Sequence, residues 1–327
     1  MKTVTLRAPG GLDSLEVRDT PDPGQPGPGQ IRVAIRATSL NYHDLLVANG
    51  SIPTEDGRVL MSDGAGVVEA VGEGVTEFQI GDHVVSGFFP QWQDGQAYDR
   101  VGNFAETPGD GVDGFAAEYA VRAATDFTHA PNGWSHAEAA TITTAGLTAW
   151  RALVVEGNLK AGQSVLVLGT GGVSIAALQI AKAMGARVIV TSSSDAKLAR
   201  ARKLGADQTI NYRRCPDWGH EVLSLTEGRG VDHVVEVGGP GTLSQSFQAV
   251  CVGGHIALIG VLTGREGQVP TGLLMAKQAR LQGLIVGNRR QQQDYIAALQ
   301  QNDLRPVIDQ SFRLDQLAEA FAVQQSG

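Results

Sequence analysis

Residues 165–186 read VLVLGTGGVSIAALQIAKAMGA, and this stretch decides the fold. A β-branched apolar run, typical of a buried strand, leads into a turn with three glycines and then into a helical segment. From Gly162 onward strand-like and helical segments alternate, and such alternation indicates one parallel sheet with helices on its faces. The six expected strands lie at residues 165–169, 188–191, 208–212, 232–239, 255–260 and 281–287.

The glycine turn has the spacing of a dinucleotide-binding strand–turn–helix unit. Gly169 permits the tight turn, and Gly171 lets the backbone approach a pyrophosphate that then faces the first helical N–H groups. Ser174 stands where a third glycine is expected, and it is small enough for close helix–strand contact. We therefore expect an α/β protein with a doubly wound Rossmann sheet. The other residues assigned to the phosphate-binding turn are Thr170, Gly172 and Val173.

The next expected strand ends in three serines, about 20 residues after the glycine turn. A carboxylate at this place usually holds the ribose 2′-hydroxyl of NAD, and here it is missing. Ser192 and Ser193 can donate hydrogen bonds to a 2′-phosphate, and we interpret Asp195 as the N-cap of the following helix. The sequence therefore favours NADP over NAD; the alternative is a solvated serine-rich loop that binds NAD indifferently. The expected pocket is completed by Lys197, Tyr212 and Arg213.

Ligands of such sheets bind at the carboxyl ends of the strands, which makes further backbone groups candidate contacts to ribose and nicotinamide. Alternatively, these backbone groups belong to ordinary strand–helix turns without a ligand, and Thr148 lies along a core helix. The candidates are Thr148, Gly238, Gly239, Gly260, Val261, Leu262, Val286 and Gly287.

The first third of the chain is rich in short β-type runs separated by Gly, Pro and Asp, which predicts a compact antiparallel domain of barrel type. A long irregular stretch with five aromatic residues follows at residues 88–114. It is either a surface loop packed on itself or a loop that covers a substrate. Ser135 and Glu138 form a capping-box pattern, so a helix begins there.

Two amphipathic segments, residues 289–301 and 314–325, are expected to fold back on the first domain. The expected division is residues 1–124 for the β domain, 125–287 for the cofactor domain and 288–327 for the return to the first domain.

Composition excludes several classes of function. The chain of 327 residues has a net charge of −8 and no block of basic residues, which argues against nucleic acid and against a membrane surface. The N-terminus lacks an apolar targeting segment, and only two cysteines occur, far apart. We expect a cytoplasmic protein that acts on a small molecule.

The β domain, the stretches NYHD (41–44), DGAGVVEAVGEGV (63–75) and TAGLTAW (144–150), and the turn GTGGVS (169–174) occur in this order. The whole chain resembles the medium-chain dehydrogenase/reductase superfamily, within it the zinc-free, quinone-oxidoreductase-like branch and relatives called zinc-type alcohol dehydrogenases. The resemblance implies a GroES-like catalytic domain beside the Rossmann domain, and a homodimer in which the strand at 281–287 pairs with its copy. Relatives usually finish with a G-x-x-G-K stretch and a last strand where this sequence reads AVQQSG, so either that strand is lost or the sequence is shortened.

Zinc-dependent members hold the metal with Cys, His and then Cys or Asp. The corresponding places here carry Asn41, Ser62 and Thr144, and amide and hydroxyl groups are poor zinc ligands. His43 and Asp63, considered as substitutes, do not make a site. We expect no metal.

Asn41 and Asp44 match the N-x-x-D pattern of the zinc-free reductases, and the resemblance assigns them, with Thr144, to the catalytic site. Tyr42 and His43 lie between them and can donate a proton or a hydrogen bond. Alternatively, His43 is only a polar neighbour of Asp44, and Asp44 only orients backbone groups at the start of a helix. Ile52 stands where relatives often carry a tyrosine, so the general acid is open.

Without a metal the best hydride acceptors already delocalise charge. The leading hypothesis is an NADP(H)-dependent, zinc-independent oxidoreductase acting on a quinone or an α,β-unsaturated carbonyl. The alternatives are a metal-free alcohol dehydrogenase and an NADPH-binding protein with little turnover.

Overall fold

The computed structural model describes residues 1–326. The chain divides into two compact units, one of Met1–Leu147 with Val286–Gly327 and one of Thr148–Ile285. No helix among residues 1–326 is both long and apolar enough to cross a membrane.

The second unit contains a six-stranded sheet in the order β11-β10-β9-β12-β13-β14, with every neighbouring pair parallel. Strand order reverses direction beside β9, so this is the doubly wound Rossmann arrangement that the sequence predicts. The fully buried strand β9, with the sequence SVLVL, lies between β10 and β12 because only a two-sided apolar strand suits the middle of such a sheet. The strands are β9 Ser164–Leu168, β10 Arg187–Ser192, β11 Gln208–Asn211, β12 Val231–Glu236, β13 Val250–Leu258 and β14 Arg280–Gly283.

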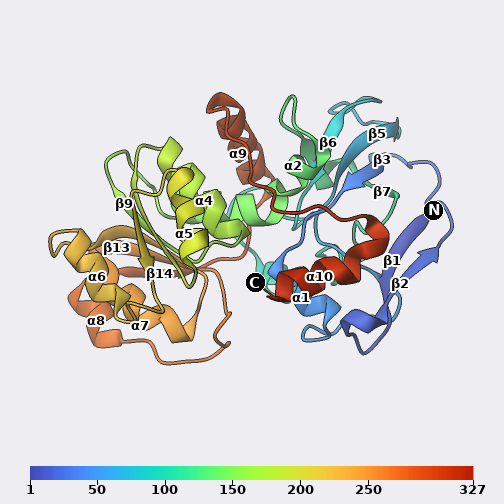
Figure 1. Ribbon diagram of the computed structural model, residues 1–327. Helices are drawn as coiled ribbons and strands as arrows, with labels where there is room; N and C mark the ends of the chain where they lie inside the picture. The colour runs from blue at the N-terminus through green and yellow to red at the C-terminus, as the bar shows by residue number, and fades with distance from the viewer. Residues whose placement is uncertain (327) are drawn as a thin grey trace. The chain divides into compact units, whose positions relative to one another are not determined.

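Helices cover this sheet, and Figure 1 shows α4 and α5 together, away from α6, α7 and α8. One face of the sheet packs Leu166 and Ile256 against Trp218 of α6 and Phe247 of α7 in a single buried apolar cluster. Helix α5 ends as expected, with Gly205 in the left-handed conformation after its last turn. The helices are α4 Gly172–Ala183, α5 Asp195–Lys203, α6 Trp218–Leu225, α7 Pro240–Ala249 and α8 Thr271–Ala276.

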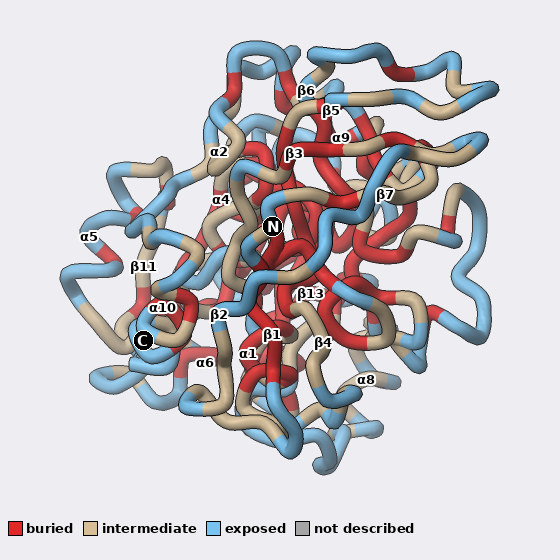
Figure 2. Tube along the Cα trace, turned by 90° about the vertical axis from the view of Figure 1, so that its right-hand side faces the viewer, coloured by how far each residue is buried: buried red, intermediate tan, exposed pale blue. Residues whose placement is uncertain are grey.

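The first unit contains two antiparallel sheets, ordered β2-β1-β4 and β7-β3-β5-β6-β8. The antiparallel β domain expected for the first third of the chain is therefore present. Figure 2 shows the buried trace through β1 and parts of β3, with exposed turns around them. The strands are β1 Lys2–Leu6, β2 Leu15–Asp19, β3 Gln30–Ala37, β4 Arg58–Val59, β5 Ala65–Val71, β6 His83–Ser86, β7 Tyr119–Ala123 and β8 Phe127–His129.

The C-terminal segment returns to this unit. Leu317 and Phe321 of α10 pack with Val4 and Leu6 of β1 and Leu45 of α1 in one buried cluster. Helix α2 begins at the expected capping box, in which Ser135 accepts from the Glu138 amide at 3.3 Å. The helices are α1 Tyr42–Ala48, α2 His136–Ala140, α9 Arg289–Gln301 and α10 Leu317–Ser326, and α3 Leu147–Trp150 begins the crossing to the second unit.

The boundary between the units lies later than the expected residue 125. Residues 127–129 form β8, which pairs with β6 in the five-stranded sheet and so belongs to the first unit. A short strand of three residues has too little period to be recognised from sequence. The chain changes units only at Thr148, within a helical stretch.

The irregular segment 88–114 contains one short helical element, η2 Asp99–Asn103. Phe88, Phe89 and Trp92 are nevertheless buried, with Phe88 and Phe89 in edge-to-face contact at 4.8 Å. The segment therefore has a packed aromatic interior of its own.

Candidate functional site

The glycine turn leaves open space above its backbone. Gly169 has φ of +74°, and neither there nor at Gly171 would a Cβ atom meet any atom within 4 Å. The amide N–H of Gly169 donates a hydrogen bond to Thr191 Oγ1 at 3.4 Å, which ties the turn to the next strand. Helix α4, twelve residues long, begins at Gly172 directly after this turn. Amides at the start of a helix beside an open, side-chain-free surface suit the pyrophosphate of a dinucleotide.

Ser174, in the place of the third glycine, has a structural function. It is 2% exposed, and its hydroxyl donates to the carbonyl of Leu168 at 2.7 Å. The bond ties the first turn of α4 to the last residue of β9, so the hydroxyl replaces the close approach that glycine gives elsewhere.

The serine-lined strand end has a defined geometry. Ser192 is buried at the end of β10, and its Oγ accepts from the amide of Ser194 at 3.4 Å. Ser193 is half-buried, and Lys197 follows in the first turn of α5. Tyr212 and Arg213, both exposed, come directly after β11, which pairs with β10 in parallel. The structure thus brings the predicted hydroxyls and the following strand end to one edge of the sheet.

The interpretation of Asp195 as N-cap is wrong by one residue. Ser194 is the cap, because its side chain accepts from the Lys197 amide at 3.4 Å. Asp195 instead accepts from Asn211 Nδ2 at 2.7 Å and forms an ion pair with Arg214, a residue that sequence analysis did not select. The acid next to the serines is therefore already paired.

The ends of β12 and β13 are organised by Glu236, which sequence analysis also missed. This carboxylate is 0% exposed and accepts from the amides of Gly238 at 2.8 Å and Gly239 at 3.0 Å, as well as from Thr242 Oγ1 at 2.6 Å. Both glycine N–H groups are therefore engaged within the turn. Thr263 donates twice to the Gly238 carbonyl, from its amide at 2.9 Å and its hydroxyl at 2.8 Å.

The remaining cofactor candidates are dispersed. Gly260 lies so close to Val237 that a Cβ would fall 1.9 Å from its carbonyl oxygen, which is a packing reason for glycine. Val261 and Leu262 follow and are exposed, whereas Thr148 is buried. Val286 and Gly287 belong to the first unit and follow β14, which ends at Gly283, so they are not part of the strand expected at 281–287.

The first unit holds a separate polar cluster built around Asn41, the residue before α1. Its amide nitrogen donates to Asp44 Oδ2 at 2.9 Å and to Asp63 Oδ2 at 2.7 Å, so one amide bridges two buried carboxylates. Asp63 also accepts from the Ser39 amide and hydroxyl, both at 2.6 Å. Thr144 donates to Asp63 at 3.4 Å, which brings this predicted residue to the same cluster.

Electrostatics in this cluster are unusual because both carboxyl groups are buried. Burial, and next the charge of Asp44, raise the pKa of Asp63 to about 7. Burial likewise raises the pKa of Asp44, against the opposing effect of His43. At neutral pH the pair therefore shares protons rather than carrying two full charges.

His43 follows Asn41 by two residues and points to a partner that sequence analysis did not find. Its Nε2 lies 3.4 Å from Oδ2 of Asp110, a buried residue of the aromatic segment. Its ring lies 4.8 Å from that of Phe104 and 5.4 Å from that of Phe88. Tyr42 is 42% exposed and stands outside these contacts. No spacing rule connects position 43 with position 110, so only the fold reveals this pair.

The residues in the places of the zinc ligands do not suit zinc. Asn41 offers only an amide oxygen as a ligand, while its amide nitrogen donates to two carboxylates, and zinc prefers thiolate and imidazole. Among residues 1–326 no three His, Cys, Asp or Glu side chains gather as a metal-binding group would. Thr144 points its hydroxyl to Asp63.

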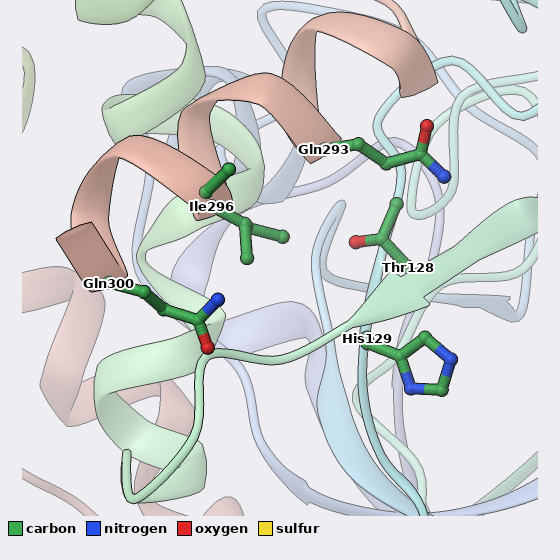
Figure 3. Close-up of a pocket in the computed structure, with 6 residues that line it drawn as sticks. Thr128, His129, Gln293, Ile296 and Gln300 are labelled. Atoms are coloured by element: carbon green, nitrogen blue, oxygen red, sulfur yellow. The ribbon is translucent and has the colours of Figure 1, made fainter.

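A hollow of about 280 Å³ lies elsewhere in the first unit, between β8 and α9. Figure 3 shows Gln293, Ile296 and Gln300 projecting from α9 toward Thr128 and His129 of β8. Its lining offers amides, a hydroxyl and one imidazole. None of the predicted site residues lines it.

A Rossmann unit with an open glycine turn and a β domain with a buried acid–amide cluster define a nicotinamide-nucleotide-dependent oxidoreductase. Residues 27–132 match the alcohol dehydrogenase GroES-like domain and residues 172–301 the zinc-binding dehydrogenase family. A zinc-type alcohol dehydrogenase-like protein of Schizosaccharomyces pombe is 42% identical over 325 residues, which is 97% of this chain and 93% of that protein. The chain belongs to the medium-chain dehydrogenase/reductase superfamily and is an NAD(P)H-dependent oxidoreductase.

Similar solved structures include an alcohol dehydrogenase and a quinone oxidoreductase. The structure of an NAD-dependent alcohol dehydrogenase has a TM-score of 0.89 at 36% identity, covering 100% of this chain and 96% of that one. A quinone oxidoreductase of Pseudomonas syringae has a TM-score of 0.83 at 28% identity, covering 99% and 96%.

Proposed function

We propose that this protein uses NADP(H), acts without zinc, and reduces a conjugated carbonyl or a quinone by direct hydride transfer. The observation that carries the proposal is the Asn41 amide bridging Asp44 and Asp63, where zinc-dependent relatives carry a thiolate ligand. A substrate that receives no Lewis-acid assistance must spread the developing negative charge over its own bonds, as enones and quinones do.

The preference for NADP is supported by the polar edge beside the glycine turn. Ser192 and Ser193 offer hydroxyls there, and the acid Asp195 is neutralised by Arg214 and held by Asn211. A carboxylate so engaged neither competes for a ribose 2′-hydroxyl nor repels a 2′-phosphate strongly.

The chain's own residues have distinct parts in this proposal. The open turn at Gly169 and Gly171 receives the phosphates, and bound NADPH supplies the hydride. The acid–amide cluster and His43 provide hydrogen-bond donors and a proton for the reduced substrate.

A second candidate is an NAD-using alcohol dehydrogenase, which is favoured by the 36% identity to a solved structure of that description. A protein that binds NADPH with little turnover is the third outcome. Absorbance of the reduced nicotinamide over a panel of quinones, enones and alcohols, before and after exhaustive chelation, separates them. Enone or quinone turnover that survives chelation supports the proposal; chelation-sensitive alcohol turnover refutes it, and binding without turnover selects the third reading.

The cofactor preference has its own test, in which Kd is measured for NADPH and NADH. Lys197→Met is expected to weaken NADPH at least fivefold and to leave NADH unchanged, because one phosphate contact is lost. Lys203→Met, at the other end of α5, is the matched control. Equal effects on both nucleotides would contradict the assignment.

We also propose a homodimer. Strand β14 is the last strand of the six-stranded sheet, so one of its edges is available to the same strand of a second copy. Sedimentation equilibrium checks this, with a monomer of 34.3 kDa as the contrary result.

A further inference from the structure

His43 and Asp110 make a buried pair that the cofactor site does not explain. The two atoms that face each other, Nε2 of His43 and Oδ2 of Asp110, are 3.4 Å apart. Both are inaccessible to water, and among residues 1–326 neither forms a well-aligned hydrogen bond, with the other or with any further group. A carboxylate oxygen and an imidazole nitrogen left in this way stabilise each other only when the nitrogen carries a proton toward the oxygen.

That arrangement fixes the histidine tautomer. With the Nε2 proton directed to Asp110, Nδ1 is the ring nitrogen left to exchange protons. The ring itself is restrained on two sides by Phe88 and Phe104, and its side chain is 14% exposed. A restrained imidazole with a carboxylate behind it is the arrangement that makes histidine an effective acid and base.

The aromatic segment 88–114 supplies every one of these restraints. Phe88, Phe104 and Asp110 all belong to it, whereas His43 belongs to α1. The sequence of this segment is compatible with a loop packed on itself and with a loop that covers a substrate. Its contacts with His43 give it a third use, as the support of one functional side chain.

We propose that His43 is the proton donor of the reaction and that Asp110 is its positioning residue. The inference rests on the proposed function, since it concerns the proton that follows the hydride. It names the general acid that the sequence leaves open at Ile52.

Hydride addition to the β-carbon of an enone breaks the C=C π bond and leaves an enolate, which has gained two electrons. The protonated His43 then transfers its Nδ1 proton to the α-carbon, which gives the saturated carbonyl and a neutral imidazole. For a quinone the proton goes to the hydroquinone oxyanion. The Nε2 proton stays directed to Asp110, and solvent reprotonates Nδ1.

Acidic side chains lie around His43. Asp110 faces it from the aromatic segment, and Asp44 is its neighbour on α1, with Asp63 beyond the Asn41 bridge. Removing Asp110 therefore takes away the one acidic group that faces Nε2 and orients the ring.

The test uses the full-length protein with NADPH and an enone. His43→Gln is expected to lower kcat at least tenfold, and Asp110→Asn to lower it less and to change the kcat–pH profile, because the proton donor is no longer held in place. Asp99→Asn, an exposed acid of the same segment, is the control and should change neither quantity. The Kd for NADPH should be the same in all variants, which also verifies that each variant is folded.

The outcomes distinguish the two proposals. If the wild type reduces no enone or quinone, the proposed function fails. If it does so and both His43→Gln and Asp110→Asn keep the wild-type kcat and pH profile, the proton assignment alone is refuted. Should Asp110→Asn not bind NADPH, restored turnover of His43→Ala by added imidazole decides instead; no restoration overturns the proposal.

Discussion

The buried carboxyl of Asp63 makes a quantitative prediction about stability and pH. Its pKa is about 7 in the folded protein, because of burial and the charge of Asp44, and an unfolded aspartate has a value near 3.9. Between pH 3.9 and pH 7 the folded state therefore binds a proton at Asp63 that the unfolded state does not bind. The stabilising contribution is therefore complete below pH 3.9 and is lost as the pH rises through 7.

The size of the effect follows from the titration. Between pH 8 and pH 6 the folded carboxyl passes from about one-tenth to about nine-tenths protonated, while the unfolded one stays ionised. The folding equilibrium constant then changes about tenfold, on the order of 1 kcal/mol. Since Asp44 and Asp63 are coupled, the proton belongs to the pair, and replacing Asp63 also removes the repulsion that raises the pKa of Asp44.

Other groups titrate in the same interval with the opposite sign. Burial lowers the pKa of His233 and of His255 to about 4, below their unfolded value near 6.5. Their contribution is present above pH 6.5 and is lost as the pH falls toward 4, which offsets the gain from Asp63. The wild-type curve alone is therefore nearly uninformative.

The assay compares two proteins. Urea unfolding of the wild type and of Asp63→Asn is measured at several values between pH 6 and pH 8, and the difference in unfolding free energy is plotted. The histidine contributions cancel in this difference, which should grow by on the order of 1 kcal/mol in favour of the wild type as the pH falls. A difference that stays constant across the interval would show that Asp63 does not titrate between pH 6 and pH 8 and would refute the reasoning.

Three further substitutions test the structure. Gly171→Ala should leave the melting temperature unchanged, because a Cβ at this position meets open space. The same substitution should weaken NAD(P)H binding at least tenfold in a fluorescence titration, because the added methyl group occupies the place of the phosphates. Gly272→Ala, where a Cβ also meets open space, is the control, and unchanged nucleotide binding by Gly171→Ala would be the contrary result. Ser174→Ala removes the 2.7 Å bond to Leu168 and should cost about 1 kcal/mol in urea unfolding, whereas no loss would argue against that bond. Glu236→Leu leaves three buried donors without their acceptor and should cost about 2 kcal/mol or more, and an unaltered denaturation midpoint would contradict this.

The fold was accessible from sequence because its signals are local and repeated. The apolar run before Gly169 and the alternation behind it gave every strand of the parallel sheet, since two-sided burial requires continuous apolar residues. Strand β8 was not recognised because three residues carry no period. The cap of α5 was misplaced by one residue because Ser and Asp are equally good caps and stand side by side.

The residues of the candidate site could be predicted from sequence only where a motif joins residues that are close along the chain. Asn41 and Asp44 lie three apart and share a contact, so their pattern carried the information. Asp63, Asp110 and Arg214 reach their partners through long-range packing, which no spacing rule encodes. Glu236 is a further case, since a buried acid within an apolar strand reads as an interruption until the turn it holds is seen.

The bridging amide at position 41 limits which residues this cluster tolerates. A cysteine there would leave Asp44 and Asp63 facing each other with no shared donor. A thiol is a weak donor and cannot bond to both carboxyls at once. A thiolate ligand at position 41 would therefore require a simultaneous change at Asp44 or Asp63.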